Sequence, residues 1–509
     1  EEAVRGGTLR ITVAAETDGL NPAANNFAVS AYTMGFPVFD PLFGVDADGD
    51  WFPWLAESAT PSDDLLSWDV KVREGILFHD GTELNADALI AHFEATLADP
   101  IISIAVRPAM NPDNPIEKID EYTVRYNRAT PTAHFPMNLT SQLGMIASPT
   151  WLADAADDPS LDQFPVGTGP FVVDSREQDE VTRFVRNEDY WRGTDEIYLD
   201  AIEISPITDT VIAAERVARG DFDVIITSNP EAQLTLESEG VNTISNVLSG
   251  EDFAMMNTSK PPFDDLRVRQ ALTFAADRQG YINLIAQGTK PAADTLFHPE
   301  LIWHNPDIVQ EANDPDRAAP LIAEYCGENP DQCTDGRVNM ELQYSGPSVT
   351  QTLIMDILSE GWKDYFNITR DELLQDDHIT EVALGQWDVV TWRQFGEADP
   401  DNEIIWLSCE TAEGAIALNW TRFCDEERDA LMFEGRATAD LDRRVEIWQE
   451  VARTINEAYT HIFFTHANWV LGFGDNVRNL CGQTGPDDTP ILCNSQGRGF
   501  YHNVWLAES

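Results

Sequence analysis

Hydrophobic and polar positions along the chain follow two periods, and each period predicts one kind of element. Residues 6–16 alternate apolar and polar side chains, as a half-buried strand does, and residues 65–78 repeat this pattern. Leu89, Phe93 and Leu97 recur every four residues, which predicts a helix with one apolar face docked on a core. Strand and helix patterns continue to the C-terminus without a repeat of fixed period or a low-complexity linker.

Later segments show the same two periods. Residues 211–226 predict a helix followed by a buried strand, and residues 253–285 predict a strand, a proline-rich bend and a helix. Residues 386–395 form an apolar strand pattern that ends in polar and aromatic side chains, and residues 440–459 form a long amphipathic helix pattern. Residues 461–480 return to strands.

A histidine beside an aspartate stands at the joint between a predicted strand and the first of these helices. His79, Asp80 and Gly81 form the predicted turn, and Asn85 is a good N-cap for a helix whose first turn carries Asp87. No nucleophile stands near the pair in the sequence. We therefore interpret the pair as a local hydrogen-bonding device rather than as part of a catalytic site.

Two other motifs also favour structure over chemistry. Asp46, Asp48 and Asp50 resemble the start of a calcium loop, but the later bidentate glutamate is missing, so a hairpin turn is favoured. Residues 167–169 read Gly-Thr-Gly, but a proline and a strand follow instead of a helix, so phosphate binding at a helix N-terminus is not supported.

Composition narrows the class of protein. The chain has 509 residues, more than one core usually supports, so two or more lobes are expected. Its 88 acidic and 32 basic residues give a net charge of −56, which repels nucleic acid and anionic membranes. This charge either attracts a cationic ligand or solvates the surface in a salty habitat; the second reading is favoured because salt screens beyond about 8–10 Å.

The cysteines indicate the compartment. No apolar run approaches the roughly 18–20 residues needed to cross a bilayer, and any export signal would already have been removed from this N-terminus. The six cysteines fall as three near neighbours, without the C-x-x-C and histidine spacing of a zinc site. We therefore predict three local disulfides, each contributing roughly 3 kcal/mol, in an extracytoplasmic protein. The predicted pairs are Cys326 with Cys333, Cys409 with Cys424, and Cys481 with Cys493.

Four landmarks carry a family resemblance. In order along the chain they are residues 68–97, residues 165–175 with 184–193, residues 256–278, and residues 398–450 with their cysteine pair. They resemble the large solute-binding proteins of ABC importers that handle dipeptides, oligopeptides, nickel and related cargo. The resemblance runs nearly from end to end.

The resemblance implies an α/β, two-lobed periplasmic-binding-protein-like fold of the large class II, cluster C type, with an extra subdomain in the first lobe. Cargo would be buried between the lobes, and closure would signal a membrane permease. The expected parts are lobe I (1–252, with the subdomain at roughly 45–165), lobe II (253–470) and a C-terminal return to lobe I (471–509), with crossings near 253–257 and 468–473.

The implied function is that of an extracytoplasmic receptor, in the periplasm or lipid-anchored at the cell surface. Its partners would be the cargo and the permease subunits of an ABC importer, and we expect a monomer with no cofactor, no metal site, no catalytic activity and no nucleic-acid partner. Two alternatives stay open: a secreted hydrolase that uses a carboxylate pair, and a sensory receptor for an opine, a sugar or a metal chelate.

Cargo identity is where the sequence departs from the family. Peptide-binding relatives hold the α-amino group with an aspartate shortly before the segment matching residues 399–402, where this chain has Phe395 or Gly396, and the nearest acid is Glu397. Dipeptide binders also use an arginine that binds the carboxylate of the cargo. The matching segment of this chain, residues 342–353, has no arginine and offers Ser345 instead. We therefore expect an oligopeptide held mainly through its backbone, or a different small molecule.

Candidate cleft residues are aromatic walls with a few polar anchors. For Trp392 and Phe395 ordinary core packing is an equal alternative, and Arg393 needs an acidic partner from the ligand or from Glu397. His461 and His466, five residues apart in a strand, would point to opposite faces, which disfavours a metal site. The ligand-binding candidates are Phe27, Tyr32, Tyr344, Ser345, Trp392, Arg393, Phe395 and Glu397.

Overall fold

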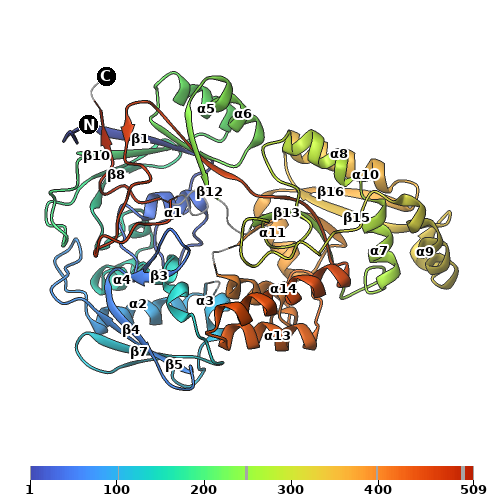
Figure 1. The fold of residues 1–509 in the computed structure, drawn as a ribbon, viewed down its shortest axis with the longest axis horizontal. Helices are drawn as coiled ribbons and strands as arrows, with labels where there is room; N and C mark the ends of the chain where they lie inside the picture. The colour runs from blue at the N-terminus through green and yellow to red at the C-terminus, as the bar shows by residue number, and fades with distance from the viewer. Residues whose placement is uncertain (1, 101, 247–249, 397–398, 494–498, 508–509) are drawn as a thin grey trace. The chain divides into compact units, whose positions relative to one another are not determined.

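A computed structural model describes residues 2–100, 102–246, 250–396, 399–493 and 499–507 (Figure 1). The chain divides into two compact units, which we call unit 1 (Glu1–Asn246 with Trp469–Ser509) and unit 2 (Val247–Asn468). The expected lobe boundaries, with crossings near 253–257 and 468–473, stay predictions. The inserted subdomain expected at roughly 45–165 stays a prediction.

The main sheet of unit 1 has seven strands in the order β12-β19-β11-β1-β10-β9-β8. Its first strand alternates as the sequence predicts, with Leu9 and Ile11 fully buried. It runs parallel to β10 and to β11. The strands of this sheet are β1 (Thr8–Val13), β8 (Phe171–Glu177), β9 (Val181–Arg186), β10 (Ala201–Pro206), β11 (Val224–Thr227), β12 (Asn242–Asn246) and β19 (Trp469–Phe473).

A separate four-stranded sheet of unit 1, in the order β4-β5-β7-β6, shares an apolar core with α2 (Ala86–Ala98). The side chain of Asn85 accepts hydrogen bonds from the N–H groups of Asp87 and Ala88, so the predicted N-cap is confirmed. The smaller strands of the unit are β2 (Phe43–Val45), β3 (Trp51–Pro53), β4 (Ala56–Pro61), β5 (Ser67–Val72), β6 (Ile116–Lys118), β7 (Thr123–Asn127), β20 (Val477–Arg478) and β21 (Trp505–Leu506). Its other α-helices are α1 (Val29–Gly35), α3 (Ile102–Val106), α4 (Pro149–Asp157), α5 (Thr210–Ala218) and α6 (Pro230–Ser238).

The sheet of unit 2 has the order β14-β15-β17-β13-β18, and β16 pairs with the other side of β15. Strands β16, β15 and β17 are parallel, whereas β13 runs antiparallel to both of its neighbours. These strands are β13 (Gly250–Met256), β14 (Cys333–Thr334), β15 (Arg337–Ser345), β16 (Phe366–Leu373), β17 (Val389–Phe395) and β18 (His461–His466).

Both faces of this sheet are covered near its centre, because β13 alternates between two cores. Ala254 and Met256 pack with helices α7, α9 and α10, whereas Phe253 and Met255 pack with α13 and α14, which lie side by side in Figure 1. The α-helices of unit 2 are α7 (Leu266–Ala275), α8 (Arg278–Tyr281), α9 (Pro315–Glu328), α10 (Val349–Trp362), α11 (Gln375–Leu384), α12 (Ile404–Leu407), α13 (Glu426–Ala437) and α14 (Leu441–Ala458).

The three predicted disulfides are confirmed. Cys326 is joined to Cys333 and Cys409 to Cys424 in unit 2, and Cys481 to Cys493 in unit 1. Each bond closes a short local loop, as the spacing in the sequence predicts.

The strand-turn-helix joint is a hydrogen-bonding device, as interpreted from the sequence. The His79 ring lies 3.0 Å, through Nε2, from the carbonyl oxygen of Gly169. The Asp80 carboxylate accepts bonds from the hydroxyl groups of Thr82 and Ser148 at 2.6 and 2.5 Å. Burial lowers the pKa of His79 to about 4, so this imidazole stays neutral near pH 7. The joint therefore fastens a turn to a neighbouring loop.

The two other motifs are structural as well. Asp46 Oδ1 accepts bonds from the N–H groups of Asp48 and Asp50, both at 2.9 Å, which is a turn between β2 and β3. Gly169 stands where a Cβ would come within 2.5 Å of the carbonyl carbon of Val38, so glycine is required by a close backbone approach.

The prediction that His461 and His466 point to opposite faces is wrong. The register of β18 against β13 shifts between Asp252 and Phe253, which marks a bulge and reverses the alternation. His461 consequently packs on Phe253, and His466 lies beside Glu251, two residues away on the same face of β13. Across the part of the chain that the structure describes, no group of three His, Cys, Asp or Glu residues suits a metal ion.

Candidate ligand-binding site

The candidate residues of unit 2 gather at one edge of its sheet. Parallel strands β15 and β16 end level at Ser345 and Leu373, and β17, which pairs Val390 with Gln343 of β15, runs on to Phe395 at the same edge. Strand β13 begins at the same edge, because Gly250 pairs with Phe395, and β18 ends there, because Glu251 pairs with His466. The carboxyl ends of parallel strands are where α/β proteins bind their ligands.

Arg393 is held at this edge by a buried carboxylate. Its Nε donates a 2.7 Å bond to Asp252 Oδ1, and Lys290 Nζ donates a 2.8 Å bond to Oδ2 of the same aspartate. The hydroxyl of Thr465 donates a third bond to Oδ2, at 3.0 Å. Among the described residues Arg393 is paired with Asp252; Glu397, the acidic partner expected from the sequence, lies outside the described residues.

One carboxylate, Asp252, faces two cations, Lys290 and Arg393, at this position. The side chains of Asp252 and Lys290 are 8% and 2% exposed, whereas that of Arg393 is 34% exposed. Burial alone would raise the pKa of Asp252, but the two neighbouring cations more than offset it and hold that pKa well below its usual range. Burial and repulsion by Arg393 lower the pKa of Lys290 to about 8. One ionised carboxylate thus holds two cations, and the arginine is the one that reaches solvent.

The other candidates of this edge divide between the two faces of the sheet. Tyr344 is buried in the core with α7, α9 and α10, and its hydroxyl donates a 3.0 Å bond to Glu372. Tyr344 therefore contributes to this core, and its role in binding stays a prediction. Ser345 is half-buried at the end of β15, and Phe395 is placed by the backbone of β17.

Trp392 belongs to a cluster of partly exposed rings on the opposite face. Its ring centroid lies 5.5 Å from His378 and 5.6 Å from Trp420, and Trp420 lies 5.4 Å from Trp406. The three tryptophans are only partly buried against the core of α13 and α14. Sequence reasoning missed Trp406 and Trp420 because they come from a short helix and a loop, where no periodic pattern marks them.

The candidates of unit 1 follow the carboxyl end of β1. Strands β1, β10 and β11 are parallel, and Phe27 and Tyr32 lie in the loop and helix α1 that come after Val13. The two rings meet edge to face, with centroids 5.5 Å apart, and Tyr32 stacks on Phe36. Both are half-buried against the core of unit 1, so they belong partly to packing.

Asp399 and Asp401, which follow β17, have structural roles. Asp399 and Asp401 accept bonds from Arg444, at 2.5 Å and 2.9 Å, and all three side chains are buried. Asp399 also accepts a bond from the N–H of Asp401, so it caps the turn.

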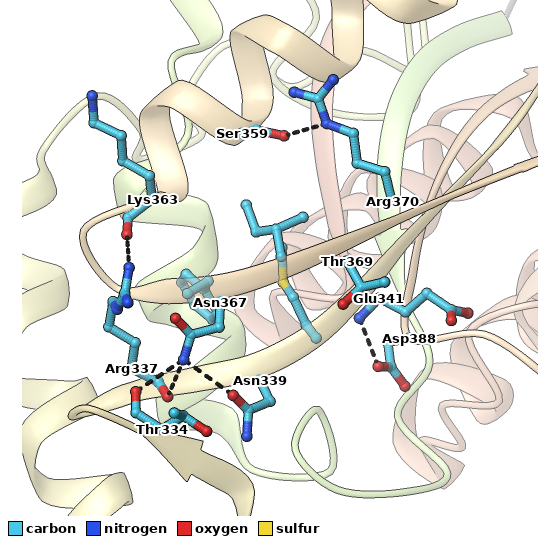
Figure 2. Close-up of a pocket in the computed structure, with 13 residues that line it drawn as sticks. Thr334, Arg337, Asn339, Glu341, Ser359, Lys363, Asn367, Thr369, Arg370 and Asp388 are labelled. Atoms are coloured by element: carbon cyan, nitrogen blue, oxygen red, sulfur yellow. Dashed lines mark hydrogen bonds between the residues drawn. The ribbon is translucent and has the colours of Figure 1, made fainter.

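An open hollow of about 790 Å³ lies on unit 2, away from the edge described above. Figure 2 shows the side chains that line it. It is lined by the first halves of β15 and β16, including Asn339 and Asn367, which hydrogen-bond each other. Arg370 is paired with Asp356, and Asp388 with Lys260. The hollow lies at the other end of β15 and β16 from the candidate residues, so we do not take it as the candidate site.

Comparison with known proteins identifies the family. Residues 50–414 match the model of the bacterial extracellular solute-binding proteins, family 5. The chain is 26% identical over 503 residues to di/tripeptide-binding protein 2 of Pseudomonas aeruginosa, covering 93% of this chain and 92% of that protein. It is 28% identical over 451 residues to heme-binding protein A of Haemophilus influenzae, covering 82% and 79%.

Solved structures share the fold. The periplasmic binding protein DppA from Helicobacter pylori, in complex with the peptide STSA, superposes with a TM-score of 0.84 at 19% identity over 99% of both chains. The protein AgaA, in complex with agropinic acid, gives 0.83 at 20% identity, also over 99% of both chains. The expected two-lobed α/β fold is confirmed, and the chain belongs to family 5 of the bacterial extracellular solute-binding proteins.

Proposed function

We propose that this solute-binding protein captures a peptide or a peptide-like small molecule outside the cytoplasm and delivers it to the permease of an ABC importer. The observation that carries the proposal is the gathering of Ser345, Trp392 and Arg393 at one carboxyl edge of unit 2. In unit 1, Phe27 and Tyr32 follow the corresponding edge. Capture by both units would favour a closed state, which the permease reads.

Arg393 is the anchor we assign to cargo. Asp252 fixes its Nε, so the guanidinium is oriented in advance, and a third of its side chain reaches solvent. A planar guanidinium suits a carboxylate or a backbone carbonyl of the cargo. Ser345 and the backbone of β17 would add hydrogen bonds, in keeping with a peptide held mainly along its backbone.

The names of similar proteins support a peptide and keep a second class open. Relatives are named for di- and tripeptides, and one neighbour was solved with the peptide STSA. Another neighbour was solved with agropinic acid, an opine, so a non-peptide small molecule is the second candidate. A sensory receptor and a hydrolase remain competing roles for the same site.

Mass spectrometry of the small molecule released when the purified protein is unfolded tests the cargo. We expect a peptide or a peptide-like acid, recovered intact, and its binding should weaken at least about tenfold in Arg393→Ala, the effect of one charge-assisted hydrogen bond. A cargo that is consumed by the protein would support the hydrolase instead. Binding unchanged in both Arg393→Ala and Trp392→Ala would remove this edge as the site.

Small-angle scattering tests the mechanism. A saturating amount of the identified cargo should reduce the radius of gyration if the units close over it. An identical scattering curve with and without cargo would contradict capture by closure.

A further inference from the structure

A second charged side chain, Glu372, lies at the candidate edge on the same face of the sheet as Arg393. Glu372 of β16 is the register partner of Tyr344 in β15, and partners in neighbouring strands point to the same face. In the same way, Leu342 of β15 is the partner of Val389 in β17. Tyr344 and Arg393 each stand an even number of residues further along these two strands, so they share that face with Glu372.

The core contacts of β13 and β15 agree with this placement. Asp252, the register partner of Arg393, precedes Ala254 by two residues in β13. Ala254 packs in the same core as Tyr344, with helices α7, α9 and α10. An acid from β16 and a cation from β17 therefore flank the carboxyl end of β15 on one face of the sheet.

The Glu372 side chain lies across the end of β15, in the direction of β17. The hydroxyl of Tyr344, a buried residue, donates a 3.0 Å bond to Glu372 Oε2. A Cβ on Gly346, the residue after β15, would lie 2.5 Å from Glu372 Cγ, so the side chain occupies space that only glycine leaves open. Glu372 itself is exposed, and its carboxylate keeps further acceptor positions after the bond from Tyr344.

The two charges are spaced for a short peptide. Neighbouring strands lie about 4.8 Å apart, so β16 and β17 are roughly 10 Å apart on either side of β15. An extended residue spans about 3.3–3.6 Å, and roughly three residues therefore fill this distance. The direction of the Glu372 side chain over Gly346 shortens the span toward two residues. A cargo of two or three residues would thus bring its ammonium to one strand and its carboxylate to the other.

We propose that Glu372 binds the α-amino group of a short peptide whose terminal carboxylate binds Arg393, and that Tyr344 is the positioning residue for Glu372. An ammonium that leaves water needs a carboxylate partner, and charge-assisted bonds at both ends fix the direction of the cargo. The N-terminus then lies over β16 and the C-terminus over β17. This direction is the reverse of the one that the family resemblance implies, in which the acid follows β17 and the arginine belongs to the segment matching residues 342–353. The inference rests on the proposed function and deepens it, because it states the charges and the direction of the cargo.

Calorimetry with three forms of Ala-Ala-Ala tests the assignment: the free peptide, the N-acetylated peptide and the C-terminal amide. In wild type, acetylation and amidation should each weaken binding at least about tenfold, the effect of one charge-assisted hydrogen bond. Glu372→Gln should bind the free peptide at least about tenfold more weakly and the acetylated peptide within about twofold of wild type. Arg393→Ala should show the complementary pattern, in which the cost of amidation disappears and the cost of acetylation remains.

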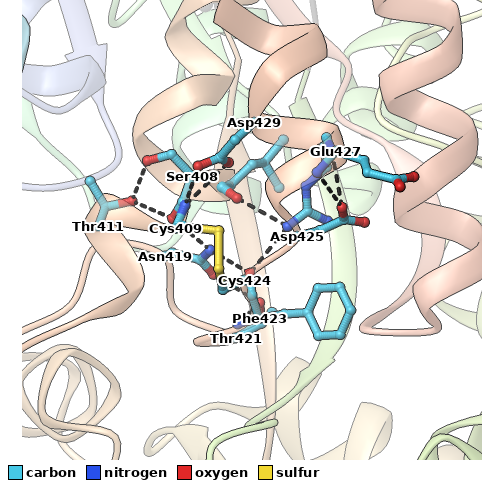
Figure 3. Close-up of a disulfide and its surroundings, with 12 residues drawn as sticks. Ser408, Cys409, Thr411, Asn419, Thr421, Phe423, Cys424, Asp425, Glu427 and Asp429 are labelled. Carbon is cyan, nitrogen blue, oxygen red and sulfur yellow. Dashed lines mark hydrogen bonds between the residues drawn. A yellow bond between two sulfur atoms is a disulfide. The ribbon is translucent and has the colours of Figure 1, made fainter.

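Glu427→Gln is the matched control. Glu427 is also an exposed glutamate of unit 2, but it lies on α13, near the disulfide between Cys409 and Cys424 (Figure 3). Helix α13 packs on the core of the opposite face of the sheet. The control removes the same charge from the protein, so it should bind all three peptides within about twofold of wild type.

The outcomes separate this inference from the proposed function. If none of the three peptides binds to wild type, the proposed peptide receptor fails, and the inference fails with it. If the free peptide binds but acetylation costs the same in wild type and in Glu372→Gln, the receptor stands and Glu372 is not an anchor. A loss in Glu427→Gln as large as that in Glu372→Gln would also overturn the inference, because it would assign the effect to net charge alone.

The positioning role of Tyr344 is tested by the cost of acetylation, which a general loss of stability does not change. Tyr344→Phe keeps the buried ring and removes the bond to Glu372, so this cost should fall at least about threefold while the cost of amidation stays within about twofold of wild type. Gly346→Ala should lower the cost of acetylation as well, because its Cβ displaces the Glu372 side chain. An unchanged cost in Tyr344→Phe removes the positioning role from the tyrosine, and an unchanged cost in Gly346→Ala contradicts the placement of Glu372 over β15.

Discussion

Replacing Asp252 by asparagine tests whether one buried carboxylate holds the cation pair at the candidate site. The carboxylate accepts bonds from Arg393, Lys290 and Thr465 at 2.7, 2.8 and 3.0 Å. An asparagine of the same shape keeps one acceptor oxygen, but it carries no charge and turns an NH2 group toward one of the two cations. The variant therefore removes the charge that both cations share and leaves the packing nearly unchanged.

The expected loss of stability follows from the two cations separately. The pKa of Lys290 is already about 8, and it falls further without Asp252; once it is below the pH, the amine releases its proton. The added cost at pH 7 is therefore capped at about 1.4 kcal/mol, the value of one pKa unit. Arg393 keeps its charge and loses a bond of about 1.5 kcal/mol, the low end for a charged group, because it is partly solvated. The total is about 3 kcal/mol, near the low end for breaking a buried pair.

Denaturant unfolding of wild type and Asp252→Asn at pH 6, 7 and 9 measures this loss. At pH 6 the Lys290 contribution is capped at about two pKa units, near 2.7 kcal/mol, and at pH 9 it vanishes because the wild-type amine is already neutral. The loss should therefore shrink as the pH rises. In a Lys290→Met background, where no amine titrates at this position, Asp252→Asn should cost the same at all three pH values. A loss that is the same at all three pH values, or that stays below about 1 kcal/mol, would refute the reasoning.

Two further predictions concern unit 1. Burial raises the pKa of Asp40 to about 6, above its unfolded value of 3.8, so its contribution to stability is present below pH 3.8 and lost as the pH rises through 6. Relative to Asp40→Asn, wild type should lose about 2.4 kcal/mol between pH 4 and pH 7 in denaturant unfolding, and a constant difference would contradict this. Gly169→Ala should lower stability by about 2 kcal/mol or more, because its Cβ would meet the backbone of Val38, and an unchanged melting temperature would show that the loop yields.

Local features of the fold could be predicted from the sequence because their causes are local. The N-cap at Asn85 depends on N–H groups two and three residues later, and the turn at Asp46 depends on groups within four residues. The disulfides follow from cysteines that are near neighbours along the chain. In each case the interacting residues are close together in the sequence, so a local sequence pattern identifies them.

The partner of Arg393 could not be predicted in this way. Asp252 is 141 residues away in sequence, and only the pairing of β13 with β17 brings the two side chains opposite each other. One signal was present: Asp252 occupies an inward position of a strand whose next inward residues are Ala254 and Met256. An acidic residue in an otherwise apolar strand face needs a cation, and that need predicts a partner without saying which one.

The bulge in β18 shows why a site can be misjudged even when its strand is correctly predicted. Sequence alternation alone puts His461 and His466 on opposite faces, and one extra residue in the strand brings them to the same face. The same shift sets Thr465 opposite Asp252, where its hydroxyl completes the carboxylate's set of donors. A regular strand would have turned that hydroxyl away from Asp252 and left the edge of the sheet without this support for Arg393.

The net charge of −56 and the cation Arg393 act on an anionic cargo at different distances. A protein so rich in carboxylates repels an anionic cargo over the distance that salt leaves unscreened, about 8–10 Å. Beyond that distance salt screens the repulsion. Which cargo binds is therefore decided by the side chains that the cargo contacts. Arg393 is such a group, because its side chain is partly exposed. Asp252 pairs with Lys290 as well as with Arg393, so its single negative charge does not neutralise both cations. Weak repulsion far away and a fixed cation at contact are compatible, and together they predict that salt raises the association rate of an anionic cargo and leaves its contact with Arg393 in place.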